Sequence, residues 1–363
     1  MNDSQRLAMR LLMVGFDGTT LPNYVGQWID QGLGGVILFR RNIESLEQLI
    51  ELNGSILGRN QPLMLGVDEE GGRVRRLRDI TSDLPPMADL GATQDPKIAY
   101  QCGALLGREL ASLGFSINFA PILDIHTNPD NPVIGDRAFA TTPEAVIRMA
   151  LPFAKGLQDM GVAACGKHFP GHGDTDTDSH LALPILDHNE HRLASIELAP
   201  FRAAAATEMA SMMTAHVVIK AYNEDHPSTL DGRALSMLRR QYRYPGVIIS
   251  DDLEMAAIAD RYSMSEAIER GLHAGVDLFL VCRRQDRIEE SIEAVIRLAE
   301  KPETAGLVGK AARRVETMIK RYVGTPAKPH LYDAKKILKA VALPKELKPS
   351  IGGFDPTETA DRV

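Results

Sequence analysis

Short apolar runs alternate with longer amphipathic segments along most of the chain. The runs are apolar throughout, a pattern typical of parallel strands that are buried on both faces. The segments between them carry apolar residues at helical spacing, and Ser45 and Gln48 are spaced as a helix capping box. Eight strands are predicted, within residues 11–18, 34–39, 62–68, 117–125, 162–169, 210–218, 245–252 and 276–282.

Eight such strands, each followed by a helical segment, predict an α/β fold of the (β/α)8 TIM-barrel type. The clearest helices are expected at 45–57, 96–113, 143–160 and 189–207. A doubly wound sheet is the alternative, but its first strand would lead into a phosphate-binding loop, and here that strand ends in Gly-Phe-Asp-Gly. We expect one catalytic domain over 1–325 and a C-terminal extension over 326–363, partly helical and partly disordered.

Composition narrows the class of protein. The chain has 363 residues, which one barrel domain can use, and its net charge of −7 gives no general reason to expect a nucleic-acid or membrane partner. The apolar run near the N-terminus is too short for a signal peptide or a membrane span. Cys102, Cys165 and Cys282 are widely separated and odd in number. Such cysteines favour reduced, buried thiols, as expected in the cytoplasm, over a disulfide framework.

Polar residues end five of the predicted strands. Because the carboxyl ends of barrel strands meet at one mouth, where barrel enzymes place their active sites, these residues predict a catalytic barrel. The residues at these strand ends are Asp68, Asp124, Lys167, His168, His216, Asp251 and Asp252. We expect Asp124 and His216 to be structural as readily as site-lining, and Asp252 to cap its own loop.

The densest polar stretch, KHFPGHGDTDTDSH over 167–180, permits three interpretations. Its first part nearly matches a phosphate-binding loop, but His168 replaces the required hydroxyl and Pro170 interrupts the following helix. A calcium loop would use Asp174, Asp176 and Asp178, but Ser179 stands where Gly is needed and Ile185 where Glu is needed. Zinc remains possible by residue type, through His172 and His180.

The third interpretation is a catalytic loop over the barrel mouth. The stretch after Pro170 is long, polar and rich in glycine, which suits a segment that moves during the reaction. Asp178 and His180 are two residues apart, so the carboxylate can orient the imidazole and tune it as a general acid or base. We prefer this interpretation to a metal or phosphate site.

Together with VDEEGGRVRRL, NPVIGDRAF and IISDDLEM, this stretch resembles glycoside hydrolase family 3. The motifs occur in the family's order from about residue 34 to residue 281. The chain is most similar to the single-domain bacterial β-N-acetylglucosaminidase branch. The resemblance implies a barrel that removes terminal GlcNAc from 1,6-anhydro-N-acetylmuramyl peptides during peptidoglycan recycling in the cytoplasm. It implies no cofactor and no metal, and we expect a monomer or a weak homo-oligomer.

The resemblance also implies roles for individual residues. Asp251 in the Ser-Asp-Asp motif matches the nucleophile, and His180 matches the acid/base with Asp178 as its partner. Retaining glycosidases usually use two carboxyl groups for these roles. A histidine serves equally well, since imidazolium donates a proton and imidazole accepts one. The positions that match the sugar-binding residues are Asp68, Arg76, Arg137, Lys167 and His168.

Several rival functions remain open. In substrate-assisted hydrolysis the acetamido group attacks, and the adjacent Asp68 and Glu69 lend it some support. A β-glucosidase of the same family commonly carries a further domain with a Glu acid/base, which this chain lacks. A sugar-binding protein without activity would not need the Asp178–His180 dyad. A metallohydrolase would lose all activity in a chelator.

Overall fold

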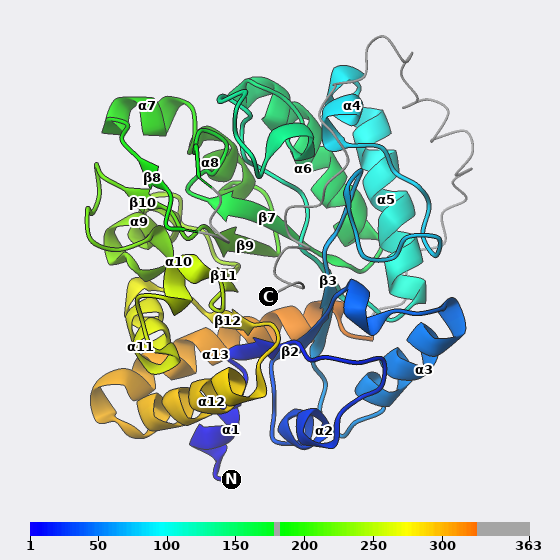
Figure 1. Cartoon of the computed structure of the whole chain (residues 1–363), viewed down its shortest axis with the longest axis vertical. Coiled ribbons are helices and arrows are strands. Elements are labelled where there is room, and N and C mark those ends of the chain that lie inside the picture. The colour runs from blue at the N-terminus through cyan, green and yellow to red at the C-terminus, as the bar shows by residue number, and fades with distance from the viewer. Residues whose placement is uncertain (178–181, 325–363) are drawn as a thin grey trace.

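The computed structural model describes residues 1–177 and 182–324, and a closed barrel of eight parallel strands forms its centre (Figure 1). Each strand pairs with its neighbours in chain order, and β1 also pairs with β12 to close the ring. The barrel strands are β1 (Leu12–Val14), β2 (Gly35–Leu38), β3 (Met64–Val67), β6 (Ile117–Asn118), β7 (Ala163–Phe169), β9 (Ser211–Thr214), β11 (Val247–Asp252) and β12 (Leu278–Val281). One barrel strand falls within each predicted range, so the predicted TIM-barrel fold is confirmed.

Helices surround the ring of strands (Figure 1). The helices are α1 (Asp3–Met9), α2 (Asn23–Asp30), α3 (Leu46–Leu57), α4 (Met87–Ala92), α5 (Pro96–Ser112), α6 (Pro143–Asp159), α7 (Glu190–Ser195), α8 (Ala199–Ala205), α9 (Gly232–Ser236), α10 (Ala256–Ala259), α11 (Met264–Ala274), α12 (Gln285–Glu300) and α13 (Pro302–Tyr322). The expectations for Asp178, His180 and residues 326–363 lie outside the described residues. The division into a domain and an extension therefore stays a prediction.

Local sequence explains where several helices begin and end. The Gln48 amide donates to Ser45 Oγ at the start of α3. The predicted capping box is only half formed, because the Gln48 side chain accepts from Glu44 N and not from Ser45. The single helix predicted over 189–207 is wrong. The chain forms two helices, α7 and α8, because a proline at position 200 has no amide to donate to the carbonyl four residues earlier. Its ring would also clash with that carbonyl in a continuous helix.

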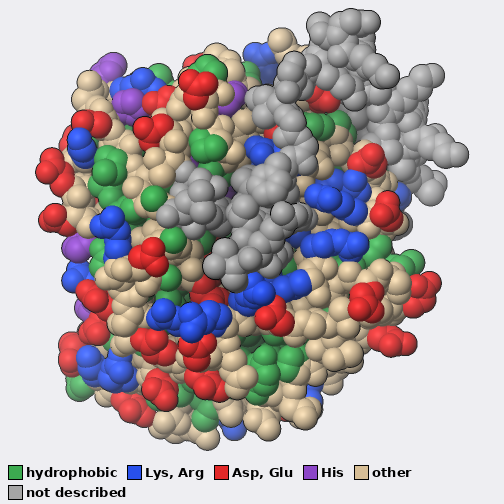
Figure 2. Space-filling view, in the orientation of Figure 1, with side chains coloured by type: hydrophobic (Ala, Val, Ile, Leu, Met, Phe, Trp, Pro, Cys, Tyr) green, Lys and Arg blue, Asp and Glu red, His purple; other side chains and the backbone are tan. Residues whose placement is uncertain are grey.

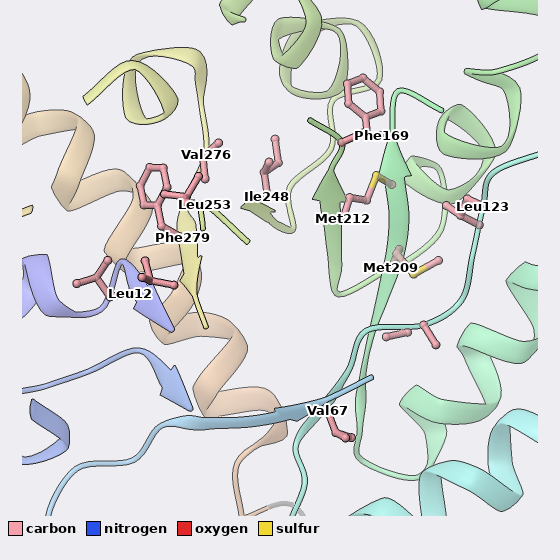
Figure 3. Close-up of a cluster of buried hydrophobic side chains, with 14 of the residues drawn as sticks. Leu12, Val67, Leu123, Phe169, Met209, Met212, Ile248, Leu253, Val276 and Phe279 are labelled. Atoms are coloured by element: carbon pink, nitrogen blue, oxygen red, sulfur yellow. The ribbon is translucent and has the colours of Figure 1, made fainter. Parts of the chain in front are cut away.

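The strands separate two apolar layers. In β1, Met13 belongs to the cluster inside the barrel, whereas Leu12 and Val14 belong to the layer between strands and helices. Figure 3 shows part of that outer layer, including Leu12, Val67 and Phe279. This alternation follows from the strand geometry, in which successive side chains point to opposite faces.

Helix α13 closes the N-terminal end of the barrel. Its residues Val315, Met318, Ile319 and Tyr322 join the cluster inside the ring. All three cysteines are buried and unpaired, as predicted. Because the bottom is sealed by apolar packing, the ligand-accessible mouth lies at the opposite end, where the strands terminate in polar residues.

Two small sheets lie outside the barrel, and the sequence pattern did not reveal either. The hairpin of β4 (Glu69–Gly71) and β5 (Val74–Arg75) follows β3, and β8 (Ile185–Leu186) pairs with β10 (Val218–Ile219).

On the face shown in Figure 2, acidic and basic side chains are interspersed outside the grey atoms. Within residues 1–177 and 182–324, no helix is both long enough and apolar enough to cross a membrane.

Candidate active site

A polar pocket opens at the carboxyl ends of the barrel strands. It collects side chains from β3, the turn after β5, the turn before α6, β7 and β11. Six of the eight predicted site residues line it, namely Asp68, Arg76, Arg137, Lys167, His168 and Asp251. The other two, Asp178 and His180, lie outside the described residues. The barrel therefore gathers six predicted side chains from separate parts of the chain at one place.

Charged groups alternate along one wall of this pocket. The Lys167 ammonium contacts Asp68 Oδ1 and Glu70 Oε1, both at 2.6 Å. The guanidinium of Arg137 donates two hydrogen bonds to Glu70, each of 2.9 Å. The fork geometry of these two bonds fixes the plane of the guanidinium. The result is a row of alternating charges, Asp68–Lys167–Glu70–Arg137, that holds each donor in one position.

Mutual pairing keeps these groups charged despite their burial. Burial alone would favour a neutral Glu70, but the charges of Arg137 and Lys167 hold the pKa of this carboxyl well below its ordinary value. Burial likewise opposes the charge on Lys167, but Asp68 and Glu70 raise the pKa of the ammonium. Such fixed charged donors and acceptors suit hydroxyl groups of a sugar, because charge-assisted hydrogen bonds are the stronger ones.

Glu69 and Glu70 point in opposite directions. Glu69 accepts hydrogen bonds from Leu77 N and from the Thr81 hydroxyl, both outside the pocket. Glu69 therefore lies outside the pocket, which removes the support that the adjacent Asp68 and Glu69 lent to substrate-assisted hydrolysis. Successive side chains of an extended segment alternate, so Glu70 lies on the side of Asp68 and Glu69 on the other. The same two-residue period would have revealed Glu70 in the sequence.

Asp124 is a buried structural hub beneath the pocket. Its carboxylate contacts His168 Nδ1 at 2.7 Å and accepts from the backbone amides of His168 and His172. Burial favours the neutral acid, but the facing His168 lowers the pKa of Asp124 below its ordinary value. Asp124 thus holds the orientation of the His168 ring through its contact with Nδ1. His216 is also structural, since its ring contacts Thr229 and the backbone of Asp252.

His172 is a pocket residue whose position the sequence did not predict. Its ring lines the cavity and Nδ1 contacts the Thr175 hydroxyl at 2.7 Å. Burial, with the nearby His168, lowers the pKa of His172 to about 4. The imidazole is therefore neutral at pH 7.

The end of β11 presents two consecutive carboxylates of different character. Asp251 lines the pocket, and its Oδ1 accepts from the amide of Asp252. Asp252 also borders the pocket, and it caps the following turn as predicted, by accepting from Glu254 N and Cys282 N. Burial and the nearby Glu254 carboxylate raise the pKa of Asp252 well above its ordinary value. Burial and Glu254 thus favour the neutral acid at Asp252, in contrast to the pocket carboxylate of Asp251.

Apolar side chains complete the pocket. Phe39 lies at the end of β2, and the guanidinium of Arg76 lies 5.9 Å from its ring centroid. Met213 and Met255 line the wall near Asp251, as expected for packing residues. A pocket that combines apolar walls with a few fixed polar groups is the usual form of a small-molecule site.

Larger cavities exist at the other end of the barrel. One of about 510 Å³ lies between α13 and the starts of β9 and β11, and a neighbouring one of about 430 Å³ is lined by α13 and the end of α11. Neither contains a predicted site residue. Because barrel enzymes carry their active sites at the carboxyl ends of the strands, size alone does not decide between these cavities, and the smaller polar pocket is the candidate site.

One group of side chains in the described part of the chain has the spacing of a metal site. It consists of Asp174, His188 and Glu197, whose ligand atoms lie within 4.8 Å of one another. The Arg192 guanidinium already contacts both carboxylates, at 3.1 Å from Asp174 and 3.3 Å from Glu197. None of these three residues lines the pocket. The positive charge of Arg192 already balances both carboxylates.

Comparisons with known proteins agree with the fold and the pocket. Residues 10–318 match the model described as glycosyl hydrolase family 3 N terminal domain. A Beta-hexosaminidase from Alkalilimnicola ehrlichii is 39% identical over 301 residues, which are 80% of this chain and 85% of that relative.

Two solved structures extend the comparison. The glycoside hydrolase family 3 β-N-acetylglucosaminidase from Paenibacillus sp. str. FPU-7 has a TM-score of 0.87 and 36% identity, over 94% of this chain and 68% of that one. NagZ from Neisseria gonorrhoeae, solved in complex with N-trifluoroacetyl-D-glucosamine, has a TM-score of 0.71 and 33% identity. The match covers 84% of this chain and 98% of that chain.

The closed barrel and the pocket at the carboxyl ends of its strands have the arrangement of a TIM-barrel enzyme. The family match covers most of the chain and specifies the class further. The chain belongs to glycosyl hydrolase family 3 and is a glycoside hydrolase.

Proposed function

We propose that this chain is a retaining exo-β-N-acetylglucosaminidase that uses Asp251 as its nucleophile. In this proposal His180 is the acid/base and Asp178 its orienting partner. The observation that carries the proposal is the pocket itself, in which Asp251 and five predicted sugar-binding residues converge. The names of the similar proteins support the choice of sugar. They are a Beta-hexosaminidase, a β-N-acetylglucosaminidase, and NagZ in complex with N-trifluoroacetyl-D-glucosamine.

The row of charges suits recognition of one terminal sugar. In the proposed complex, Asp68 accepts from sugar hydroxyls, and Lys167, Arg137, Arg76 and His168 donate to them. Each of these groups is held by a buried partner or by the pocket wall before the sugar arrives, so little side-chain entropy is lost on binding. A small pocket with several fixed polar groups for one sugar fits removal of a terminal residue better than cleavage within a chain.

The reaction proceeds in two displacements. An oxygen of Asp251 bonds to the anomeric carbon as the glycosidic C–O bond breaks, and His180 gives its proton to the departing oxygen. Neutral His180 then takes a proton from water, whose oxygen bonds to the anomeric carbon and releases Asp251. Asp251 ends a barrel strand, a rigid position that suits an atom which must attack from one direction.

The nucleophile is tested by trapping. A 5-fluoro N-acetylglucosaminyl fluoride should form a slowly hydrolysed ester, and mass spectrometry of the digested enzyme should find the label on Asp251. We expect Asp251→Asn to lower kcat/KM by about 10³-fold or more, because an amide does not replace the attacking carboxylate. The matched control is Asp252→Asn, which should stay within about 10-fold because the asparagine oxygen can still accept from Glu254 N and Cys282 N. A label on another residue, or tight thiazoline inhibition with no ester, contradicts the proposal.

The sugar preference is tested with chromogenic substrates. We expect 4-nitrophenyl N-acetyl-β-glucosaminide to be cleaved with a kcat/KM at least about 10²-fold above that of 4-nitrophenyl β-glucoside. This ratio corresponds to about 3 kcal/mol of contacts with the acetamido group. Equal rates on the two substrates would favour the family-3 β-glucosidase or a broad-specificity glycosidase instead.

We further propose that the natural substrate is a GlcNAc-1,6-anhydroMurNAc peptide, from which the enzyme removes GlcNAc in the cytoplasm during peptidoglycan recycling. The support is the motif resemblance together with the likeness to NagZ. Incubation with GlcNAc-1,6-anhydroMurNAc should release free GlcNAc, detected by chromatography. If the enzyme instead cleaves chitobiose efficiently and leaves this disaccharide intact, the assignment to recycling is wrong.

A further inference from the structure

The segment between β7 and α7 has two described arms, an outgoing arm over residues 170–177 and a returning arm over residues 182–189. Asp174 lies on its outgoing arm and His188 on its returning arm, fourteen residues later, and the two side chains are joined by a hydrogen bond between Asp174 Oδ2 and His188 Nε2. Arg192, in the first turn of α7, contacts the same carboxylate oxygen at 3.1 Å. The two arms are therefore tied together at the base of the segment 175–187.

The outgoing arm is fixed against the loop that follows β6. Thr127 Oγ1 donates to Asp174 Oδ1 at 2.6 Å, and the Asn131 amide donates to the carbonyls of His172 and Thr175. A side chain at Gly173 would place its Cβ 1.7 Å from the carbonyl oxygen of Ile125, so only glycine permits this close approach.

The returning arm is fixed independently. The pairing of β8 with β10 holds residues 185–186 against 218–219, and the Asp187 carboxylate contacts Lys220. Beyond His188, the Arg192 guanidinium also reaches Glu197 Oε1 at 3.3 Å. Glu197 is buried and packs against Gly171, at the beginning of the outgoing arm. Both arms thus meet at one cluster, which we name the clasp and define as Thr127, Asp174, His188, Arg192 and Glu197.

The clasp depends on the negative charge of Asp174, which its contacts favour. Partial burial favours the neutral acid, but the hydrogen bonds from Thr127 and His188 and the charge of Arg192 lower the pKa of Asp174 below its ordinary value. The carboxylate therefore accepts hydrogen bonds from Thr127 and His188 and pairs with the Arg192 guanidinium, which joins the loop after β6 to the returning arm.

We propose that Asp174 and His188 are positioning residues, and that the clasp fixes the base of the segment bearing the acid/base dyad. The inference rests on the proposed function, because Asp178 and His180 are four and six residues beyond Asp174. A fixed base restricts where those side chains reach, and a misplacement of about 1 Å at a reacting group can cost about 10²-fold in rate. Neither clasp residue lines the pocket, so they act through the dyad and not on the sugar.

The first test separates proton transfer from sugar binding. With 4-methoxyphenyl N-acetyl-β-glucosaminide, whose leaving group needs a proton, Asp174→Ala and His188→Ala should lower kcat/KM by about 10- to 100-fold. With the 2,4-dinitrophenyl substrate, whose leaving group needs none, the loss should be under about 3-fold. The dissociation constant of GlcNAc should not change. His188→Gln should restore most activity, because the glutamine amide places a donor near the position of Nε2.

The second test is a double-mutant cycle with His180→Ala. Once His180 is absent, Asp174→Ala should have no further effect on either substrate. The matched control is Asp176→Ala, which removes an exposed carboxylate from the same segment and should resemble the wild type.

Three outcomes overturn the clasp: Asp174→Ala and His188→Ala match Asp176→Ala, or Asp174→Ala costs as much with His180 absent as with it present, or both substrates slow equally. Failure of the proposed function looks different, since His180→Ala itself would then show no dependence on the leaving group. His188 is partly exposed, so His188→Ala keeps the test valid if Asp174→Ala does not fold.

Discussion

Glu70 connects the two buried cations of the pocket, so its loss should affect both stability and catalysis. In Glu70→Gln, Arg137 and Lys167 lose the charge that compensates their burial. We expect the free energy of unfolding to fall by about 3 kcal/mol. We expect kcat/KM to fall by about 10²-fold, because both donors move from their positions. Urea denaturation and steady-state kinetics measure the two effects.

The adjacent residue supplies a matched control for this prediction. Glu69→Gln changes the same functional group one position earlier, on the side of the strand that faces away from the pocket. Glu69 pairs with Arg75 outside the pocket, so its replacement should leave the row of charges in place. Activity should stay within about 3-fold of the wild type. Equal losses in the two variants would mean that the row of charges has no special role in the site.

His172 should make stability depend on pH in a defined window. The pKa of its imidazole is about 4 in the folded chain, against an ordinary value of 6.5. Between these values the unfolded chain binds a proton that the folded chain does not, so stability falls as the pH is lowered from 6.5 towards 4. The full contribution is about 3 kcal/mol. Urea denaturation at pH 7, 6 and 5 should show a smaller loss for His172→Asn than for the wild type.

An exposed histidine provides the comparison for this measurement. His273 lies on the surface near the end of α11, and His273→Asn should keep the pH slope of the wild type. The pH range 5 to 6.5 avoids most carboxyl titrations, which lie lower. An unchanged slope in His172→Asn would mean that the ring is not held neutral by the fold.

The site residues differ in how far the sequence alone could predict them. Asp251, Asp68 and Lys167 end apolar strands, so the barrel hypothesis placed them at one mouth. The residues that hold the site side chains in position come from distant parts of the sequence. Glu70, which binds Arg137, lies 67 residues before it, and Asp124, which binds His168, lies 44 residues before it. Such pairings depend on the twist and register of the closed barrel, and no local pattern encodes them.

At the scale of elements, strands that lie within longer apolar runs were predictable, and the short strands outside the barrel were not. All eight barrel strands follow from apolar runs, because burial on both faces leaves a strong signal. The β4–β5 hairpin and the β8–β10 pair contain only two or three residues per strand, too few for a period to be seen. The break between α7 and α8 had a visible cause in Pro200, which the helical spacing of the apolar residues concealed.

Helix α13 should contribute to stability but not to catalysis. Ile319 is buried among the barrel-interior side chains, at the end of the barrel remote from the pocket. We expect Ile319→Ala to lower the free energy of unfolding by about 2–4 kcal/mol, through lost burial and the cavity that remains. KM and kcat below the unfolding transition should not change. Lys320→Ala, at the exposed neighbouring position, should leave both properties unaltered. A raised KM in Ile319→Ala would contradict this separation.

At the scale of the whole molecule, the pocket draws its residues from strands on different sides of the ring, so a bound sugar should stabilise the entire barrel. GlcNAc at 100 times its dissociation constant should add about 2.7 kcal/mol. For a chain of this size that corresponds to a rise in Tm of about 4 °C. Differential scanning fluorimetry across a GlcNAc titration measures it, with glucose as the comparison sugar.

Two variants separate binding from scaffold stability in the same experiment. Ile319→Ala should lower the Tm of the unliganded enzyme and keep the full rise on adding GlcNAc, because its pocket is intact. Glu70→Gln should lower the initial Tm and also lose most of the rise, because its donors no longer hold the sugar. If the two variants lose the rise equally, the ends of the barrel are coupled, and the pocket cannot be treated as a site built on an independent scaffold.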